Sequence, residues 1–251
     1  MLFPIKDYNP TKNTAIITIL FIIINVFVFI YQSTYVPKEV NKQFNGKIDA
    51  LRYNILSFAV IPKEITHLKK YNLPIARDNY GRVYSITRDL PILLTLLTSM
   101  FMHGSFMHLF GNMVVLWIFG NNIEDYLGMF KFIVFYLLVG LIAGLAHIVF
   151  NWNSTVPVIG ASGAISGIMG AYLILYPKAK VKTLVFVLIF ITFIDIPASV
   201  FLIIWFFFQF FYKASDGVAF LAHIGGFIAG AILIYNWRKY KKSKKIIEFI
   251  P

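Results

Sequence analysis

A few polar side chains that could carry out acyl transfer stand among strongly apolar runs of this sequence. Ser162 lies in a Gly-Ala-Ser-Gly stretch, His223 begins a later apolar run, and His108 and Asn112 begin an earlier one. A serine hydroxyl becomes a nucleophile when an imidazole within about 2.6 to 3.2 Å accepts its proton. Amide and imidazole N–H groups can stabilise the oxyanion that forms next. These residue types suit serine hydrolase chemistry if the fold brings them together.

The composition places these residues in a membrane protein. Of 251 residues, 59% are hydrophobic and 14% are charged, whereas soluble domains are about 45 to 50% apolar and roughly 25% charged. The absence of cysteine excludes a disulfide framework, a thiol nucleophile and a Cys-ligated zinc site. The net charge of +12 does not indicate a nucleic-acid partner, because six of the 23 basic residues lie in RKYKKSKK at 238–245, after the last apolar run. We expect that segment to contact anionic lipid of the bilayer.

Six apolar runs are expected to cross the membrane as helices, since a span needs about 20 apolar residues. They cover residues 15–31, 105–122, 131–150, 160–176, 196–211 and 217–237. Residues 183–195 are expected to be an apolar lead-in to the fifth span, because an isolated Asp195 is costly in the middle of a membrane. The alternative is a seventh, short span over these 13 residues.

The predicted organisation has four parts. They are a cytoplasmic N-terminus with the first transmembrane helix (1–31), an extracytoplasmic membrane-associated loop (32–89), a five-helix catalytic core (90–237) and a basic cytoplasmic tail (238–251). Basic residues near the N-terminus, in two turns and in the tail fall on one side when the span count is even, which predicts the cytoplasmic side. Short amphipathic helices and turns on the membrane, rather than a separate globular domain, are expected in the loop.

The candidate residues are predicted to meet near one membrane surface. The second, fourth and sixth spans begin at the extracytoplasmic side and carry their polar residues within about 10 Å of it, at about 1.5 Å of rise per residue. Small residues four apart would let two of these spans approach closely. These residues are Gly163 and Gly167 on the Ser162 helix, and Gly226 and Gly230 on the His223 helix.

On these residues the sequence resembles the rhomboid family of intramembrane serine proteases. The matching segments are HGSFMHLFGNM at 103–113, GNNIEDYLG at 120–128, GASGAISGIMGAY at 160–172 and AHIGGFIAGA at 222–231. The resemblance implies an all-α, six-transmembrane-helix bundle. It assigns Ser162 as nucleophile, His223 as general base, and His108 and Asn112 as oxyanion-stabilising side chains. It also implies transmembrane protein substrates that enter laterally between helices, without a metal or another cofactor.

The sequence departs from the pattern of some family members at the position four after the nucleophile. There Ser166 replaces an aromatic residue that packs on the histidine ring, and it is also the competing candidate for nucleophile. The only acids after residue 131 are Asp195, Asp216 and Glu248, and none is expected to reach His223. We therefore expect a Ser–His dyad whose imidazole is oriented by packing.

Other interpretations stay open at this point. The chain could be a catalytically silent rhomboid-like binding protein or chaperone, or a small transporter with a histidine proton relay. His103 is equally compatible with a role in the site and with a merely structural or water-facing position, whereas His147 and His67 are expected to be incidental. The Lys-, Asn- and Ile-rich composition favours a prokaryotic plasma membrane, with the active site opening to the extracytoplasmic side.

Overall fold

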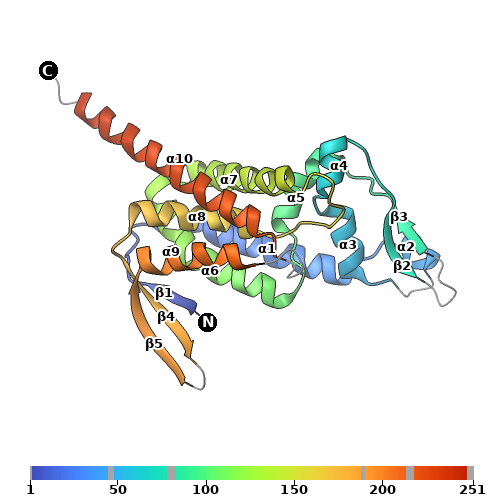
Figure 1. The fold of residues 1–251 in the computed structure, drawn as a ribbon, viewed down its shortest axis with the longest axis horizontal. Coiled ribbons are helices and arrows are strands. Elements are labelled where there is room, and N and C mark those ends of the chain that lie inside the picture. Colours follow the sequence, from blue (N-terminus) through green and yellow to red (C-terminus); the bar gives the residue numbers. More distant parts are fainter. Residues whose placement is uncertain (1, 45–47, 78–82, 188–189, 213–217, 248–251) are drawn as a thin grey trace.

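The computed structural model describes residues 2–44, 48–77, 83–187, 190–212 and 218–247, and its long helices form a bundle (Figure 1). These helices are α1 (Ile16–Thr34), α6 (Phe106–Leu127), α7 (Met129–Phe150), α8 (Ser162–Leu175), α9 (Ala198–Phe208) and α10 (Phe220–Ile247). Four of them, α1, α6, α7 and α10, are long and apolar enough to cross a membrane, while α8 and α9 are shorter apolar helices. The predicted helical membrane bundle is therefore confirmed.

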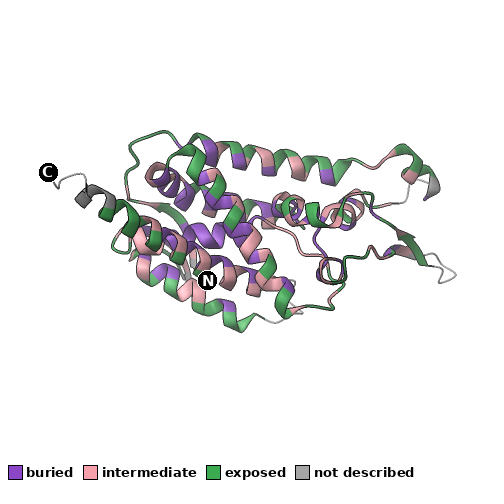
Figure 2. Ribbon diagram, turned by 90° about the horizontal axis from the view of Figure 1, so that it is seen from above, coloured by how far each residue is buried: buried purple, intermediate pink, exposed green. Residues whose placement is uncertain are grey.

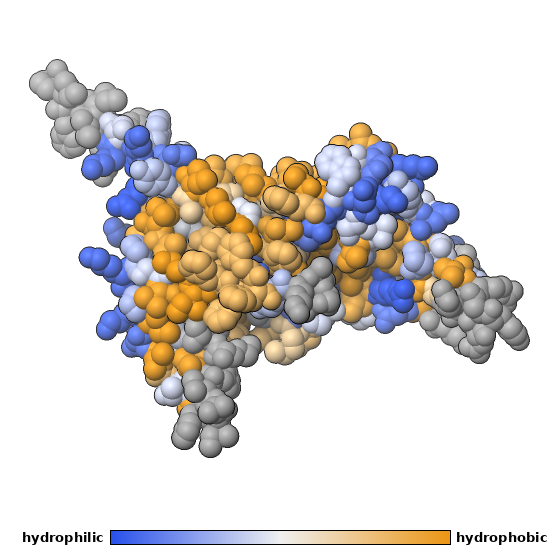
Figure 3. Space-filling model, viewed as in Figure 1, coloured by the Kyte–Doolittle hydropathy of each residue, from blue (hydrophilic) through white to orange (hydrophobic). Residues whose placement is uncertain are grey.

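Helix α8 lies at the centre of the bundle, where it contacts α6, α7, α9 and α10. Its residues from 163 to 172 are all buried, and Figure 2 shows buried positions gathered where the helices face one another. On the face that Figure 3 shows, the middle of the bundle is mostly apolar, and hydrophilic side chains gather towards its two ends. This distribution suits a body whose middle faces lipid.

Glycines set the close approach of α8 and α10. A Cβ atom on Gly226 would lie 2.1 Å from the Gly163 carbonyl oxygen, and one on Gly230 would lie 2.0 Å from the Gly167 carbonyl oxygen. No side chain fits at these positions without moving a backbone. The predicted small-residue packing between the two helices is confirmed.

The N-terminal ends of α1 and α6 are fixed by side chains. The Ser105 hydroxyl accepts a hydrogen bond from the His108 backbone N–H at 3.1 Å, which is an ordinary N-cap of α6. At the other end of α6, the Glu124 carboxylate accepts from the backbone N–H groups of Ile17 and Thr18 at 2.8 and 2.7 Å. Glu124 therefore caps α1 from a neighbouring helix.

The described residues 183–187 and 190–195 differ from the prediction, because they form strands rather than a lead-in or a seventh span. Strands β4 (Lys180–Val187) and β5 (Phe190–Pro197) form an antiparallel hairpin, and β1 (Leu2–Asp7) pairs with β4 in the order β1-β4-β5. The run is rich in Val, Ile, Phe and Thr, which favour strands. Asp195 stands opposite Lys182 in the ladder, so its charge lies outside the helical spans.

The segment from 32 to 89 contains the expected short helices and an additional hairpin. The elements are α2 (Lys38–Gln43), α3 (Ala50–Phe58), α4 (Pro62–His67), β2 (Leu73–Arg77) and β3 (Val83–Ile86). They enclose a small hydrophobic cluster of their own, formed by Phe44, Leu56, Ile61, Leu73 and Ile75. Short turns η1 (Ile92–Leu94), α5 (Thr95–Thr98) and η2 (Ser99–Phe101) then lead into α6.

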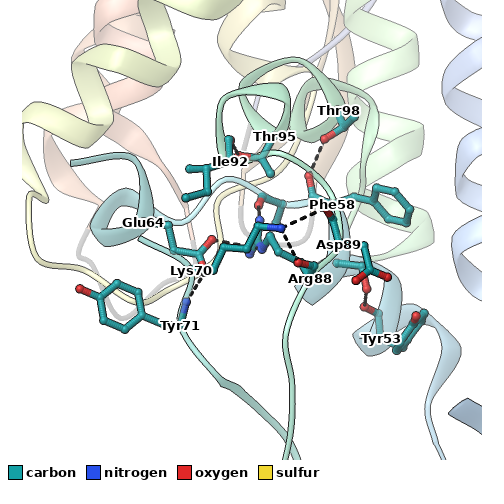
Figure 4. Close-up of polar contacts among 12 residues, drawn as sticks. Tyr53, Phe58, Glu64, Lys70, Tyr71, Arg88, Asp89, Ile92, Thr95 and Thr98 are labelled. Carbon is teal, nitrogen blue, oxygen red and sulfur yellow. Dashed lines mark hydrogen bonds and ion pairs between the residues drawn. The ribbon is translucent and has the colours of Figure 1, made fainter. Parts of the chain in front are cut away.

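A buried ion pair holds this segment together. Arg88 Nε lies 3.1 Å from Glu64 Oε2, and both side chains are almost fully buried. Figure 4 shows the pair beside Lys70, whose ammonium donates to the carbonyl oxygens of Arg88 and Asp89 at 2.8 and 3.0 Å. Burial lowers the pKa of the Arg88 guanidinium, and the Glu64 charge partly opposes that shift.

Candidate active site

The candidate nucleophile and base meet at the N-terminal ends of two helices. Ser162 is the first residue of α8, and His223 lies in the first turn of α10. The Ser162 hydroxyl oxygen and His223 Nε2 are 2.8 Å apart, within hydrogen-bonding distance. The glycine contacts between α8 and α10 explain this reach, because they bring the two backbones together just below the pair.

The other side of the His223 ring is held by a residue that the sequence analysis did not single out. His223 Nδ1 lies 2.8 Å from the Oε1 atom of Gln209. Gln209 is buried at the end of α9, where the helix tightens into a 3₁₀ turn (Gln209–Phe211). The Trp205 ring lies 5.9 Å from the His223 ring, measured between centroids. The expectation that packing alone orients the imidazole was wrong.

Both contacts carried a signal in the sequence. Gln209 is an amide in a strongly apolar run, and such residues are costly in a membrane and usually functional. Trp205 lies four residues earlier, on the same helical face. The aromatic support missing at Ser166 thus comes from a different helix.

The Ser166 side chain lines the same cavity but is hydrogen-bonded within its own helix, whereas the His223 ring nitrogens contact Ser162 and Gln209. The Ser166 hydroxyl donates to the Ser162 carbonyl oxygen at 2.6 Å, one turn back along α8, and its side chain is buried. A hydroxyl bonded to the preceding turn is a common arrangement for serine inside a helix.

His108 lies beside the proposed nucleophile, and one of its ring nitrogens already accepts a hydrogen bond. The Gly104 backbone N–H lies 3.4 Å from His108 Nδ1, and because that group can only donate, Nδ1 acts as the acceptor. The neutral ring then carries its proton on Nε2. A Cβ atom at Gly160 would lie 3.0 Å from His108 Nε2 and 3.5 Å from the Ser162 hydroxyl oxygen, so Gly160 occupies the space between them.

Gly160 also needs its special backbone freedom. Its φ angle is +123°, which L side chains rarely adopt. Its N–H donates to the Ser99 carbonyl oxygen at 2.8 Å, which fixes the turn before α8. The glycine therefore serves both the turn and the space beside His108.

Asn112 supplies a free donor in the same region. Its Nδ2 atom is buried and has no hydrogen-bond partner in the structure. A buried amide N–H without a partner is unfavourable, so its presence here suits a group that is satisfied only when a ligand oxygen arrives. Asn112 and His108 lie one turn apart on α6, as predicted.

All four predicted site residues, Ser162, His223, His108 and Asn112, line one cavity of about 860 Å³. Its wall also contains residues of α9, including Phe201 and Trp205, and of the N-terminal strand, namely Phe3 and Pro4. The Phe3 ring stacks on Phe110 of α6 at 6.4 Å between centroids. The N-terminal strand thus borders the cavity that holds the dyad.

The remaining histidines divide into three environments. The His103 ring is fully buried and packs edge-on against His108 at 5.1 Å, and the His103 backbone N–H and carbonyl both bond to the Gln32 side chain. His103 therefore has a structural position beneath the site. His147 lines the cavity without contacting the dyad, and His67 lies in α4 outside it.

In the described part of the chain, none of the acids after residue 131 supplies a carboxylate that could orient the His223 imidazole. Asp195 is in β5, away from the cavity, while Asp216 and Glu248 lie outside the described residues. Among the described residues, no group of three or more His, Cys, Asp or Glu side chains could hold a metal ion. The arrangement supports nucleophilic attack by a serine with histidine as the base.

Comparisons with known proteins match the region that contains this site. The family model described as "Rhomboid domain" matches residues 92–240, which is more than half of the chain. The matched region includes α6 to α9 and most of α10, and with them each of the four predicted site residues.

Individual relatives match over shorter stretches. Rhomboid protein 1, mitochondrial, of Saccharomyces cerevisiae is 32% identical over 97 residues, which are 37% of this chain and 28% of the relative. Presenilin-associated rhomboid-like protein, mitochondrial, of Homo sapiens is 28% identical over 146 residues, 57% of this chain and 38% of the relative. Rhomboid protease GluP of Bacillus subtilis is 40% identical over 78 residues, 31% of this chain and 15% of the relative. The match thus spans well under half the length of each relative.

Proposed function

The chain belongs to the rhomboid family, and we propose that it is an intramembrane serine protease that uses Ser162 and His223 as a catalytic dyad. The observation that carries this proposal is the 2.8 Å contact between the Ser162 hydroxyl and His223 Nε2 inside a cavity of the helical bundle. A relative that is named as a rhomboid protease, GluP, supports the same activity.

The proposed reaction is acyl transfer through a covalent intermediate. Ser162 attacks the carbonyl carbon of a peptide bond while His223 Nε2 takes the hydroxyl proton. His223 then gives that proton to the leaving amine, so that the peptide bond breaks and an acyl-enzyme is left on Ser162. Water, activated by the same imidazole, hydrolyses the acyl-enzyme and restores the serine.

The negative charge on the carbonyl oxygen is proposed to be stabilised by three donors. They are the Asn112 amide, the His108 Nε2–H and the Ser162 backbone N–H. The last is available because the first N–H groups of an α-helix have no partner within it. Donors that are already in place before the reaction stabilise the transition state most effectively.

The proposed substrates are transmembrane or membrane-proximal segments of other proteins in the lipid bilayer. The apolar face of the bundle in Figure 3 and the cavity wall formed by residues of α6 and α9 are compatible with lateral entry. We propose no nucleic-acid partner and no cofactor, and we place residues 32–89 and the cavity on the extracytoplasmic side and residues 238–251 in the cytoplasm. The matched relatives include mitochondrial proteins, and they do not support the expected prokaryotic plasma membrane over a mitochondrial membrane.

The test is cleavage of a model transmembrane substrate by the purified protein in liposomes. Ser162→Ala and His223→Ala should each abolish cleavage and labelling by a fluorophosphonate. Ser166→Ala is the matched control, because it removes a hydroxyl one turn away and should keep activity. Cleavage by Ser162→Ala, or labelling at Ser166, would contradict the proposed dyad.

The alternative function is binding without catalysis by a silent family member. The intact Ser162–His223 contact argues against it. If wild-type protein crosslinks to the substrate segment in liposomes but neither cleaves it nor reacts with fluorophosphonate, the binding function replaces the protease proposal.

A further inference from the structure

The structure points to Gln209 as a positioning residue that fixes the tautomer and orientation of the His223 imidazole, so that the catalytic unit is a Ser–His–Gln triad. This inference rests on the proposed protease function. It is carried by a chain of hydrogen bonds in which each donor and acceptor can be assigned.

The chain begins at the end of α9. The Gln209 backbone N–H donates to the Phe206 carbonyl oxygen, three residues back, because the helix tightens into a 3₁₀ turn at this point. The Trp205 carbonyl oxygen, which a continuing α-helix would pair with that N–H, instead accepts from the Gln209 side chain at 2.9 Å. The tightened turn thus binds the amide of its own last residue.

This bond determines which way the amide faces. A carbonyl oxygen can only accept, so the atom of Gln209 that contacts Trp205 must be the NH₂ group. The amide oxygen, Oε1, is then the atom that faces His223 Nδ1 at 2.8 Å. Gln209 is 2% exposed, so most of its side chain is shielded from bulk water.

The orientation of the Gln209 amide determines which ring nitrogen of His223 carries the proton. Oε1 can only accept, so His223 Nδ1 must carry the proton of the neutral ring. His223 Nε2 then has a lone pair, and this lone pair faces the Ser162 hydroxyl at 2.8 Å. That is the tautomer that a general base requires, and an aspartate provides it in serine protease triads.

Glutamine differs from a carboxylate in one chemical respect. It orients the ring and accepts its N–H, but it adds no negative charge to stabilise the imidazolium that forms during the reaction. A neutral acceptor also avoids burying an unpaired charge among the apolar residues of α9 and α10. The Trp205 ring, which packs near His223, limits the remaining rotation of the imidazole.

The test compares Gln209→Leu, which removes the acceptor, with Gln209→Glu, which keeps an acceptor for His223 and adds a charge but loses the donor to the Trp205 carbonyl oxygen. The expected result for Gln209→Leu is a kcat about 5- to 150-fold lower, the range that corresponds to one unmade buried hydrogen bond, with little change in KM. Gln209→Glu should recover kcat relative to Gln209→Leu. It should also move the acidic limb of the pH–rate profile to higher pH, because a carboxylate beside the ring favours the imidazolium.

The control is Phe207→Leu, a substitution on the exposed face of the same helix, which should leave kcat and the pH profile unchanged. Melting temperatures in detergent identify any variant that fails to fold, and the rate of fluorophosphonate labelling of Ser162 reports the nucleophile separately from substrate binding.

The outcomes separate this inference from the protease proposal. Wild-type kcat in Gln209→Leu, together with an inactive Ser162→Ala, would overturn the role of Gln209 and leave the protease function standing. Equal losses in Gln209→Leu and Gln209→Glu without a shifted pH profile would also overturn it, since that pattern means only a packing role. No cleavage by wild-type protein would instead refute the protease function.

Discussion

At the scale of single residues, the site has few polar atoms, and three histidine ring nitrogens near the nucleophile already have hydrogen-bond partners. His223 contacts Ser162 through one nitrogen and Gln209 through the other, and His108 Nδ1 accepts from Gly104. Asn112 Nδ2 differs from these three ring nitrogens, because it is buried without a partner. In the proposed reaction, this unpaired donor would make its hydrogen bond when the oxyanion forms.

We predict that Asn112→Ala lowers kcat about 100- to 1000-fold, the usual effect of removing one oxyanion donor, with little change in KM. Single-turnover cleavage of a transmembrane substrate in liposomes measures this effect. Asn151→Ala is a suitable control, because Asn151 lines the same cavity but its amide already donates to the His147 carbonyl oxygen. Similar kcat values in Asn112→Ala and wild type would remove Asn112 from the oxyanion site.

The sequence indicated the proposed nucleophile and base more clearly than the residue that contacts the other side of the imidazole. Ser162 and His223 stand out because polar groups in apolar runs are costly, and they do meet in the structure. Gln209 obeys the same rule, but its position 14 residues before His223 gives no hint of a contact. Its partner depends on a local 3₁₀ turn and on how α9 packs against α10, and neither is visible in the residue pattern.

At the scale of elements, the dyad depends on how closely α8 approaches α10. The Gly163, Gly167, Gly226 and Gly230 spacing predicted this approach, and the structure places backbone atoms where any Cβ would stand. In lipid, such packing replaces the hydrophobic effect as the main attraction between helices. The glycines therefore contribute to the geometry of the proposed dyad as well as to the fold.

We predict that Gly230→Ala lowers the free energy of unfolding by about 1 to 3 kcal/mol, the typical cost of overpacking, and also lowers kcat. The added Cβ would meet the Gly167 carbonyl oxygen at 2.0 Å, so the helices must separate. Gly144→Ala on α7 is the control, because nothing lies within 4 Å of the added atom. Unfolding curves in mixed detergent micelles give both stabilities, and equal values for the two variants would show that the close contact is unimportant.

The strands are where the sequence analysis failed. Hydropathy and the cost of a buried Asp195 assigned residues 183–195 to a lead-in before the fifth span, but this run is rich in β-branched and aromatic residues and pairs with itself and with Leu2–Asp7. Pairing between segments nearly 180 residues apart cannot be found from local patterns. Its consequence is that the N-terminal strand reaches the cavity wall through Phe3 and Pro4.

We predict that Phe3→Ala raises kcat/KM for a transmembrane substrate about 2- to 13-fold. A substrate that enters beside α6 must displace the Phe3 ring from Phe110, and an aromatic pair contributes about 0.5 to 1.5 kcal/mol. Phe106→Ala is matched to it, because Phe106 stacks on Phe110 as well but does not line the cavity. Competition between full-length substrates in liposomes measures the ratio, and a rate increase in both variants would assign the effect to Phe110 mobility instead.

At the scale of the whole molecule, the chain combines a helical bundle that carries the site with a smaller unit between residues 32 and 89. The sequence predicted the short helices of this unit but not its own hydrophobic cluster or the buried Glu64–Arg88 pair. In the segment from 32 to 89, polar and apolar residues alternate as they do at a protein surface, because only a few residues form its core. The Glu64–Arg88 ion pair adds a buried polar contact to this small hydrophobic cluster. Lys70 links the pair to the residues before η1, because its ammonium donates to the carbonyl oxygens of Arg88 and Asp89.

We predict that Arg88→Met loosens this smaller unit and leaves the bundle intact. Removing one partner of a buried pair typically costs about 3 to 5 kcal/mol, because the other charge stays buried and unpaired. The double variant Glu64→Gln/Arg88→Met should recover most of that loss, since the glutamine oxygen can still accept from the Tyr71 backbone N–H, which lies 3.0 Å from Glu64 Oε1. Hydrogen exchange in α4 and β2, compared with α8, measures the local effect, and Lys38→Met controls for loss of an exposed charge.

If the double variant exchanges as fast as Arg88→Met, the unpaired Glu64 charge is not the cause. If α8 exchanges faster too, the two units unfold together, and the segment from 32 to 89 supports the geometry of the dyad directly.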